Sequence, residues 1–323
     1  MNVLVTGGAG YIGSHTARAL TRAGFVPIVL DNLSKNGTRG LEWRPLVKAD
    51  LSNKEALVAV LRDLQIKAVI HMAAFIEVGE SVQDPLRYYK NNVGGSLSLL
   101  EAMVECGVEH LIFSSTAAVY GEPEVIPIPE THATNASSPY GKSKLMVEHA
   151  ISDVEAVTPL RAVRLRFFNA SGAHREGGIG ENHDPETHLI PRACLAILGK
   201  VPPLEIFGKD YDTPDGTAIR DYIHVEDIAQ AHVQALKYLQ QGGIGTAFNL
   251  GSGQGFSVHE VISAVEKVSG REVPKSFAPR RAGDPARLVA DSTRAREILG
   301  WEPAYTAIED IAATAWKWHS TEQ

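Results

Sequence analysis

Short apolar runs alternate with amphipathic stretches along the first half of the chain. The apolar runs predict strands over residues 3–6, 25–30, 46–50, 68–71 and 110–113. The stretches between them carry apolar residues at helical spacing, as in Ile12, Ala17 and Leu20, and they predict further helices over 53–64, 85–106 and 140–157. Strands and helices that alternate over short connections, here to about residue 168, predict a parallel sheet covered on both faces.

The pattern loosens beyond Asn169 into loops, prolines and shorter elements. It predicts helices over 221–240, 258–269, 292–299 and 307–319, and a strand over 247–250, with residues 221–250 returning to the main sheet. The predicted fold is α/β, a Rossmann-type doubly wound parallel sheet made by residues 1–168. Residues 169–323 are expected to form mainly a smaller C-terminal substrate-binding lobe.

Three glycines spaced three apart follow the first predicted strand. Gly7 allows a sharp turn, Gly10 allows backbone N–H groups to approach a pyrophosphate, and Gly13 lets the helix lie close on the sheet. Strand 25–30 ends in Asp31, where a carboxylate accepts hydrogen bonds from an adenosine ribose. This acid would repel a 2′-phosphate, so the motif favours NAD over NADP. The alternative is an ordinary strand–helix turn.

Two later strand ends also face the expected cofactor. Asp50 and Leu51 are placed to meet an adenine ring, and Asp50 alternatively caps the following helix, although both roles can hold together. Met72, Ala73 and Ala74 would leave room for the diphosphate and a ribose. His71, just before them, is interpreted as a packing residue.

Asn91 and Asn92 stand near the centre of the predicted helix 85–106, where asparagine is unfavourable unless it binds something. One of them is expected to contact the backbone or the cofactor, and the cofactor contact is assigned to Asn91. Helices 85–106 and 140–157 carry apolar residues on a second face, which indicates a partner helix and favours a homodimer.

Hydroxyl and phenol groups gather around the fifth strand. Ser114, Ser115 and Thr116 follow it, at the carboxyl end where open α/β sheets bind ligands. Tyr140 and Lys144 are four residues apart and share one helix face. A Y-x-x-x-K pair alone is also common as a surface pair, but here it follows a glycine loop and a strand that ends in hydroxyls.

At these residues the chain resembles the extended, nucleotide-sugar-modifying branch of the short-chain dehydrogenase/reductase superfamily, over essentially its whole length. The generic motifs are GGAGYIGSH at 7–15, DNL at 31–33, YKNNV at 89–93, FSSTAAVYG at 113–121 and YGKSK at 140–144. More selective are RFFN at 166–169, IFG at 206–208 with Asp210 and Tyr211, RDYIHV at 220–225 and APRRAGD at 278–284. The selective set resembles the 4-epimerases of UDP-glucose and UDP-galactose.

The resemblance implies an NAD-dependent isomerase of galactose metabolism that passes through a transient 4-keto sugar. Tyr140 would be the base, and Thr116 would relay the proton. Lys144 and the positive nicotinamide ring would bring the phenol pKa from about 10 to about 7, a stabilisation of roughly 4 kcal/mol.

The resemblance also implies the binding residues. Further cofactor contacts would come from Tyr11, Ile12, Asn32, Ser114, Tyr140, Lys144 and Phe168. The UDP-sugar would contact Thr116, Tyr140, Asn169, His188, Leu189, Phe207, Arg220, Arg281 and Asp284. No metal site is expected.

The chain departs from the family pattern at a few places. Thr116 replaces a serine and keeps its hydroxyl, whereas Ile76 replaces a lysine and removes a contact to the cofactor diphosphate. Phe167 stands for a tyrosine, and His188 stands for an asparagine but can still donate to a phosphate. Leu288 occupies the place of a bulky aromatic residue, so UDP-N-acetylhexosamines are predicted to be accepted as well.

Other readings stay open at this point. A 4-epimerase of UDP-pentoses or UDP-uronates is poorly separated by sequence. A sugar-nucleotide dehydratase needs acidic residues after the hydroxyl, where this chain has Ala117 and Ala118. A non-catalytic NAD-binding protein of the same fold would not need Thr116, Tyr140 and Lys144.

Composition limits the partners. The chain has 323 residues, 44% of them hydrophobic, and a formal charge of −7, which argues against a general nucleic-acid surface. Cys106 and Cys194 stand far apart within apolar helical patterns and are expected to stay unpaired in a reducing compartment. No apolar run approaches the roughly 18 residues that span a bilayer, so a cytoplasmic protein without a membrane partner is expected.

Overall fold

A seven-stranded parallel sheet forms the centre of the protein, for which the computed structural model describes residues 1–35, 45–281 and 284–321. Its strand order is β10-β6-β5-β4-β1-β2-β3. The strands are β1 (Asn2–Thr6), β2 (Val26–Asp31), β3 (Leu46–Lys48), β4 (Ala68–His71), β5 (His110–Thr116), β6 (Arg161–Phe167) and β10 (Thr246–Leu250). The order reverses between β1 and β4, the switch point where such sheets open a crevice for ligands. The predicted doubly wound α/β sheet is confirmed.

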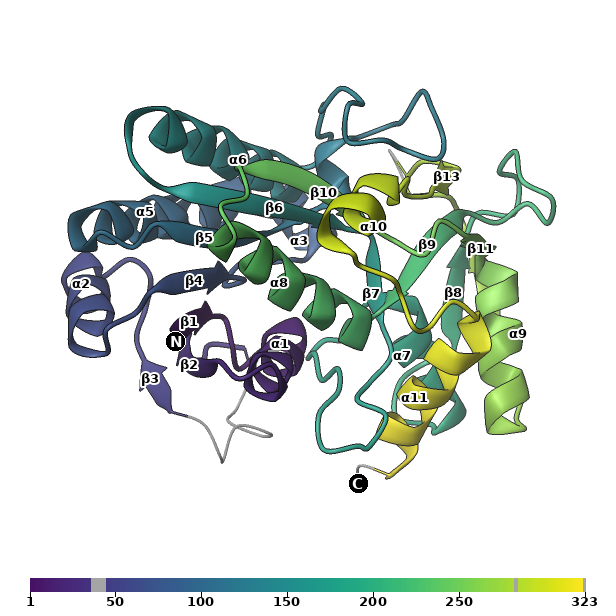
Figure 1. Ribbon diagram of the computed structural model, residues 1–323. Helices are drawn as coiled ribbons and strands as arrows, with labels where there is room; N and C mark the ends of the chain where they lie inside the picture. The colour runs from purple at the N-terminus through teal and green to yellow at the C-terminus, as the bar shows by residue number, and fades with distance from the viewer. Residues whose placement is uncertain (36–44, 282–283, 322–323) are drawn as a thin grey trace.

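Helices cover both faces of this sheet (Figure 1). One face packs against α2 (Lys54–Asp63), α5 (Gly95–Cys106) and α6 (Pro139–Val157), through residues such as Leu4 and Val69. The other face packs against α1 (Tyr11–Arg22) and α8 (Val225–Gln240). Neighbouring strand residues point to opposite faces, so apolar residues fill every position of β1 from Val3 to Val5.

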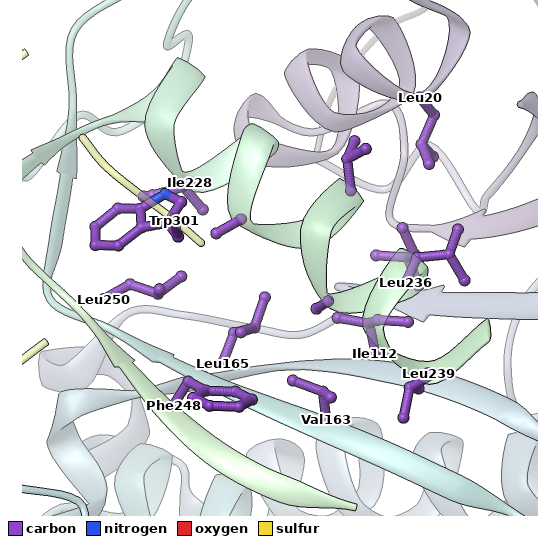
Figure 2. Packing of buried hydrophobic residues seen from close by; sticks show 14 of the residues in the cluster. Leu20, Ile112, Val163, Leu165, Ile228, Leu236, Leu239, Phe248, Leu250 and Trp301 are labelled. Carbon is purple, nitrogen blue, oxygen red and sulfur yellow. The ribbon is translucent and has the colours of Figure 1, made fainter. Parts of the chain in front are cut away.

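Figure 2 shows how α8 lies on its face of the sheet. Ile228 and Leu236 of α8 face the strand residues Leu165 and Phe248, and all four side chains are buried. The buried Trp301 closes the end of this cluster and donates from Nε1 to the Asp227 carbonyl at 2.9 Å. Residues far along the chain thus complete the core under the first half.

The predicted helix 85–106 is interrupted by a wider turn. It consists of α4 (Pro85–Tyr88), the π-helical segment η1 (Tyr89–Gly94) and α5, and a short α3 (Val78–Gln83) precedes it. The buried Asn92 lies in η1, where its side chain accepts from the Phe75 N–H at 2.8 Å and donates to the Phe75 carbonyl at 3.0 Å. A π turn of this kind often marks a functional site.

The second half of the chain builds a smaller lobe around its own apolar cluster. That cluster joins α7 (Leu189–Ile197), α9 (Val258–Ser269) and α11 (Ile308–Thr321), which lie together at the right of Figure 1. The lobe holds β7 (Asn169–Ser171), β8 (Leu204–Phe207), β9 (Ile219–His224), β11 (Gly255–Ser257), β12 (Lys275–Ala278) and β13 (Arg287–Leu288). The strands form two small sheets, one centred on β9 and one pairing β8 with β12.

The prediction of a helix over 221–240 is wrong at its start. Residues 221–224 belong to β9, and α8 begins only after His224, whose side chain accepts from the Glu226 N–H at 3.1 Å. Asp221 is buried and pairs with Gly255 of β11, and its carboxylate accepts from the Ser252 and Ala290 N–H groups across the lobe. The following α8 and β10 do return to the main sheet, as predicted.

The helices over 258–269, 292–299 and 307–319 are confirmed as α9, α10 (Thr293–Leu299) and α11. Within the described ranges, no helix is long and apolar enough to cross a membrane. Cys194 is buried, Cys106 is partly buried, and both are free thiols. The assignment of one lobe to the nucleotide and the other to the substrate remains a prediction about ligands.

Candidate active site

The glycine loop between β1 and α1 is fixed by backbone sterics. Gly7 has φ of 68°, and a Cβ there would lie 2.7 Å from the Ala73 nitrogen. A Cβ at Gly13 would lie 2.2 Å from the Gly7 carbonyl oxygen. Contacts this short exclude any side chain, so both glycines are needed where predicted. Gly10 is the N-cap of α1, and no side chain caps this helix end or puts an acid in its first turn.

Asp31 ties the loop to the end of β2. Its carboxylate accepts from the Ala9 N–H at 3.1 Å and from the Leu33 N–H at 2.8 Å. The carboxylate therefore stands beside the glycine loop, on the side of the switch point where a ribose contact is predicted.

Asp50 is not the cap of the next helix. Asn53 is the N-cap of α2 and accepts from the Ala56 N–H at 3.0 Å, so the capping alternative for Asp50 is wrong. Asp50 instead accepts from the Asn32 side chain at 2.7 Å and from Ser52, and these bonds lower the pKa of Asp50. The structure thus joins two residues that were both assigned to the cofactor.

The end of β4 lies against the glycine loop. The Thr6 hydroxyl is 2.7 Å from His71 Nδ1 and accepts from the Met72 and Ala73 N–H groups at 3.3 and 3.4 Å. Ser96 Oγ lies 2.8 Å from His71 Nε2, and burial lowers the pKa of His71 to about 3. His71 is therefore neutral and fully bonded, which confirms the packing interpretation.

Of the two asparagines on the interrupted helix, Asn92 makes the backbone contacts. Besides its bonds to Phe75, it donates to Ser143 Oγ of α6 at 3.0 Å. Asn91 is only partly buried and donates to Asn92 Oδ1 at 2.9 Å. One asparagine, Asn92, contacts the backbone as expected. The cofactor contact of Asn91 stays a prediction.

Thr116, Tyr140 and Lys144 meet at the carboxyl end of β5. Tyr140 is buried and hydrogen-bonded to Thr116, and the Thr116 hydroxyl also accepts from the Ala118 N–H at 3.2 Å. Lys144 Nζ donates to the Ser114 carbonyl at 2.8 Å. The predicted hydroxyl-ended strand and the Tyr–Lys helix are therefore in contact.

Burial changes the acid–base behaviour of this group. It raises the pKa of Tyr140 to about 12, against the opposing effect of the Thr116 hydrogen bond. It lowers the pKa of Lys144 to about 8, while Glu148 acts in the other direction. The chain alone therefore does not make Tyr140 a base at neutral pH. The prediction from sequence started from the ordinary phenol pKa of about 10 and did not include the effect of burial.

A buried ion pair lies one turn further along α6. Arg166 donates to both carboxylate oxygens of Glu148, at 3.0 and 2.5 Å, and to the Tyr120 hydroxyl at 3.0 Å. Glu148 also accepts from the Ser115 hydroxyl at 2.5 Å. This network was not predicted from the sequence, and it fixes Ser115, the strand residue between Ser114 and Thr116. Arg166 is the first residue of the RFFN motif, so the motif pointed to this arginine but did not identify Glu148 as its partner.

Four of the residues predicted to bind the UDP-sugar form two contacts in the smaller lobe. The Arg281 guanidinium lies 3.9 Å over the Phe207 ring, and Arg220 forms an ion pair with Asp284. Tyr211 links the neighbourhood, since its hydroxyl donates to Asp284 at 3.4 Å. Four residues predicted to hold one nucleotide are thus paired with each other.

The remaining predicted substrate residues lie elsewhere in the lobe. Asn169 opens β7 and its side chain is hydrogen-bonded to Tyr222, while Phe168, assigned to the cofactor, is buried just before it. His188 is the N-cap of α7, and Leu189 is the first residue of that helix. His188 Nδ1 lies among carboxylates that the sequence analysis did not assign.

The fold and this arrangement are those of the short-chain dehydrogenase/reductase class, and comparison with known proteins narrows the assignment. Residues 3–251 match the model of the NAD dependent epimerase/dehydratase family. The chain belongs to this family, whose members are enzymes, and it is similar over nearly its whole length to proteins described as UDP-glucose 4-epimerases.

Three relatives illustrate the similarity. A UDP-glucose 4-epimerase of Rhizobium meliloti is 49% identical over 99% of this chain and 97% of the relative. The crystal structure of UDP-glucose 4-epimerase from Brucella ovis in complex with NAD has a TM-score of 0.96 at 48% identity, covering 98% of this chain and 97% of that one. The enzyme from Bifidobacterium longum with NAD+ and UDP has a TM-score of 0.95 at 38% identity, covering 100% and 99%.

Proposed function

We propose that this chain interconverts UDP-glucose and UDP-galactose at C4 with NAD as its cofactor. The proposal rests on one observation above all. The Tyr140 phenol and the Thr116 hydroxyl are hydrogen-bonded beside the buried Lys144, at the carboxyl end of a central strand. Relatives that carry the same activity in their names are about half identical to the chain over its full length.

The glycine loop fits a dinucleotide. A helix end without a side-chain cap or an acid in its first turn leaves N–H groups free for a diphosphate, and the cradle between Gly7 and Ala73 has no room for a Cβ. NAD would be held by Gly7, Gly10, Tyr11, Ile12, Gly13, Asp31, Asn32, Asp50, Leu51, Met72, Ala73, Ala74, Asn91, Ser114, Tyr140, Lys144 and Phe168. When bound, its nicotinamide ring supplies the acceptor and later the donor for the C4 hydrogen.

The chain supplies the proton transfer. Tyr140 takes the proton of the 4-hydroxyl, with Thr116 bonded to the same oxygen, and returns it after the sugar has turned. Moving the phenol pKa from about 12 to about 7 requires roughly 7 kcal/mol of preferential stabilisation of the phenolate. Lys144, with a pKa of about 8, stays largely cationic at pH 7 and supplies part of it. The rest must come from the positive charge of the cofactor.

The smaller lobe would hold the UDP moiety. The Phe207 ring would stack on the uracil, and in this structure the Arg281 guanidinium covers that ring. Arg220 and Arg281 would bind the diphosphate. Asp284 would meet the ribose, and Asn169, His188 and Leu189 would complete the contacts with the sugar nucleotide.

Product analysis tests the proposal. The chain is expected to convert UDP-galactose to UDP-glucose, and Tyr140→Phe is expected to lower kcat by about 1,000-fold. The matched control is Tyr89→Phe, a change outside the proposed site. Full turnover by Tyr140→Phe would remove the assigned base, and no conversion by the unchanged chain supplied with NAD would contradict the function.

Leu288 favours a wider sugar preference. It lies in β13 opposite Arg220 and packs against the cluster that contains Phe168, so a leucine rather than a large aromatic ring borders this part of the lobe. UDP-N-acetylhexosamines are therefore proposed as additional substrates. An assay in which UDP-galactose reacts and UDP-N-acetylglucosamine does not would count against this extension.

We also propose a cytoplasmic homodimer that pairs α5 and α6 of two copies. Leu97 and Val104 of α5 and Met146 of α6 are exposed by 42 to 47%, which is unusual for apolar side chains in one region. Leu97→Glu is expected to shift the chain toward the monomer in sedimentation, whereas an unchanged mass would argue against this interface.

A further inference from the structure

The connection from β7 to α7 carries two glutamates and two histidines close together. Glu181, His183, Glu186 and His188 each offer a ligand atom, and these atoms all lie within 4.8 Å of one another. Both glutamates are buried, and both histidines are partly buried. From the sequence, no metal site was predicted, and among these four residues only His188 was given a role, as a donor to a phosphate.

The distances describe a compact set of oxygen and nitrogen atoms. His188 Nδ1 lies 2.8 Å from Glu181 Oε1 and 2.9 Å from Glu186 Oε1. His183 Nδ1 lies 3.0 Å from Glu181 Oε1 and 3.8 Å from Glu186 Oε2. Ligands about 2.0–2.2 Å from a tetrahedral cation stand roughly 3.3–3.5 Å apart, which lies within the observed range.

The set is chemically suited to a transition metal. Imidazole nitrogen and carboxylate oxygen together are typical ligands of zinc and its neighbours, whereas calcium and magnesium prefer oxygen alone. Two carboxylates also balance the charge of one divalent cation, which suits a site where both acids are buried.

Hydrogen bonds alone leave the cluster incomplete. Glu181 Oε1 faces both imidazole nitrogens, yet Glu181 Oε2 is buried and has no hydrogen-bond partner among the described residues. A buried carboxylate oxygen without a partner is rare and needs a cause. A cation bound to this carboxylate would supply the missing partner.

We propose that Glu181, His183, Glu186 and His188 bind one divalent transition-metal ion with the coordination preferences of zinc. The ion fixes the connection between the lobes. The His183 ring lies edge-on to Tyr11 of α1 with centroids 6.4 Å apart, and the Glu181 carbonyl accepts from Trp318 Nε1 of α11 at 2.7 Å. The site therefore lies between the first helix and the last, independently of whether a sugar nucleotide is the substrate.

Cobalt provides a direct test, because Co²⁺ bound by two nitrogens and two oxygens absorbs visible light. The full chain is treated with a chelator, dialysed, and titrated with CoCl₂ and, separately, with ZnCl₂. About one ion per chain should remain after gel filtration, with a four-coordinate cobalt spectrum that added zinc abolishes. Either metal should also raise the melting temperature.

Variants locate the ion. Glu181→Gln and His183→Gln should each weaken cobalt binding by at least about 10-fold and lose the spectrum, while His149→Gln on the exposed face of α6 should behave like the unchanged chain. Circular dichroism checks that each variant is folded, and one folded variant of the two is enough for the test. No retained ion, or the same spectrum in a folded Glu181→Gln or His183→Gln chain, would overturn the proposal in favour of ion pairs alone.

Discussion

The sheet edge around Gly7 and the lobe around Arg220 are built by different kinds of contact. At the sheet edge, backbone atoms stand so close that no Cβ fits at Gly7 or Gly13. In the lobe, Arg220 pairs with Asp284 while Arg281 stacks on Phe207, and these side chains are partly exposed. The first region is fixed by its own backbone packing, whereas the second is held by side-chain pairs, which the proposed binding of a diphosphate would have to replace.

The largest effect is expected where the backbone leaves no room. Gly13→Ala places a methyl group against the Gly7 carbonyl, so it should destabilise the chain by about 3 kcal/mol and abolish NAD binding. Gly79→Ala is the matched control, because nothing lies within 4 Å of the added Cβ in exposed α3. Urea unfolding measures the stability of both variants. Equal unfolding midpoints would show that the glycine loop accommodates the added methyl group without cost.

Lys144 extends the comparison, because it is a buried cation on the sheet side. Its pKa of about 8 lies below the ordinary 10.5, so the unfolded chain binds more protons between these values. The contribution of Lys144 to stability is therefore complete above pH 10.5 and is lost as the pH falls through 8. Lys144→Met should raise stability at pH 7 by about 2 kcal/mol and lose activity.

Urea unfolding between pH 7 and 9.5 checks this prediction. This range lies below the pKa of Tyr140, which is about 12 in the folded chain and about 10 in the unfolded chain. The unchanged chain should gain stability as the pH rises, and Lys144→Met should gain less. Lys142→Met, an exposed change on the same helix, should follow the unchanged chain. Parallel curves for all three would mean that Lys144 keeps an ordinary pKa.

The smallest effect on stability is expected in the lobe. Arg220→Met removes a partly exposed ion pair, so the unfolding free energy should change by less than about 1 kcal/mol. The KM for UDP-galactose should rise by about 10-fold, with NAD binding unchanged. The exposed Arg271→Met serves as control. A large loss of stability without a change in KM would reverse the roles assigned to the two regions.

The same contrast explains what the sequence could predict. The sheet and the roles of Gly7 and Gly13 follow from local patterns, because a turn and a close approach need particular residues in adjacent positions. The π turn at Asn92 depends on Phe75, 17 residues away, and is invisible to periodicity. Residues 221–224 of β9 were predicted to be helical because the partners of this strand, β7, β11 and β13, lie far away along the chain.

Side-chain partners were harder still. Arg166 stands in a quoted motif, but Glu148 became its partner only when α6 packed beside β6. The raised pKa of Tyr140 likewise reflects burial by many segments, and no spacing of Tyr140 and Lys144 reports it. Local motifs thus predict which residues belong to the site, whereas their partners and pKa values depend on how the whole chain folds around them.

The central claim is that C4 is oxidised and reduced within one active site while Tyr140 moves only the hydroxyl proton. UDP-galactose deuterated at C4, incubated with the chain and NAD in ordinary water, tests it most directly. The account predicts UDP-glucose that keeps the deuterium at C4. Product that has exchanged this deuterium for solvent hydrogen would contradict the account, because the carbon would then have lost its hydrogen as a proton.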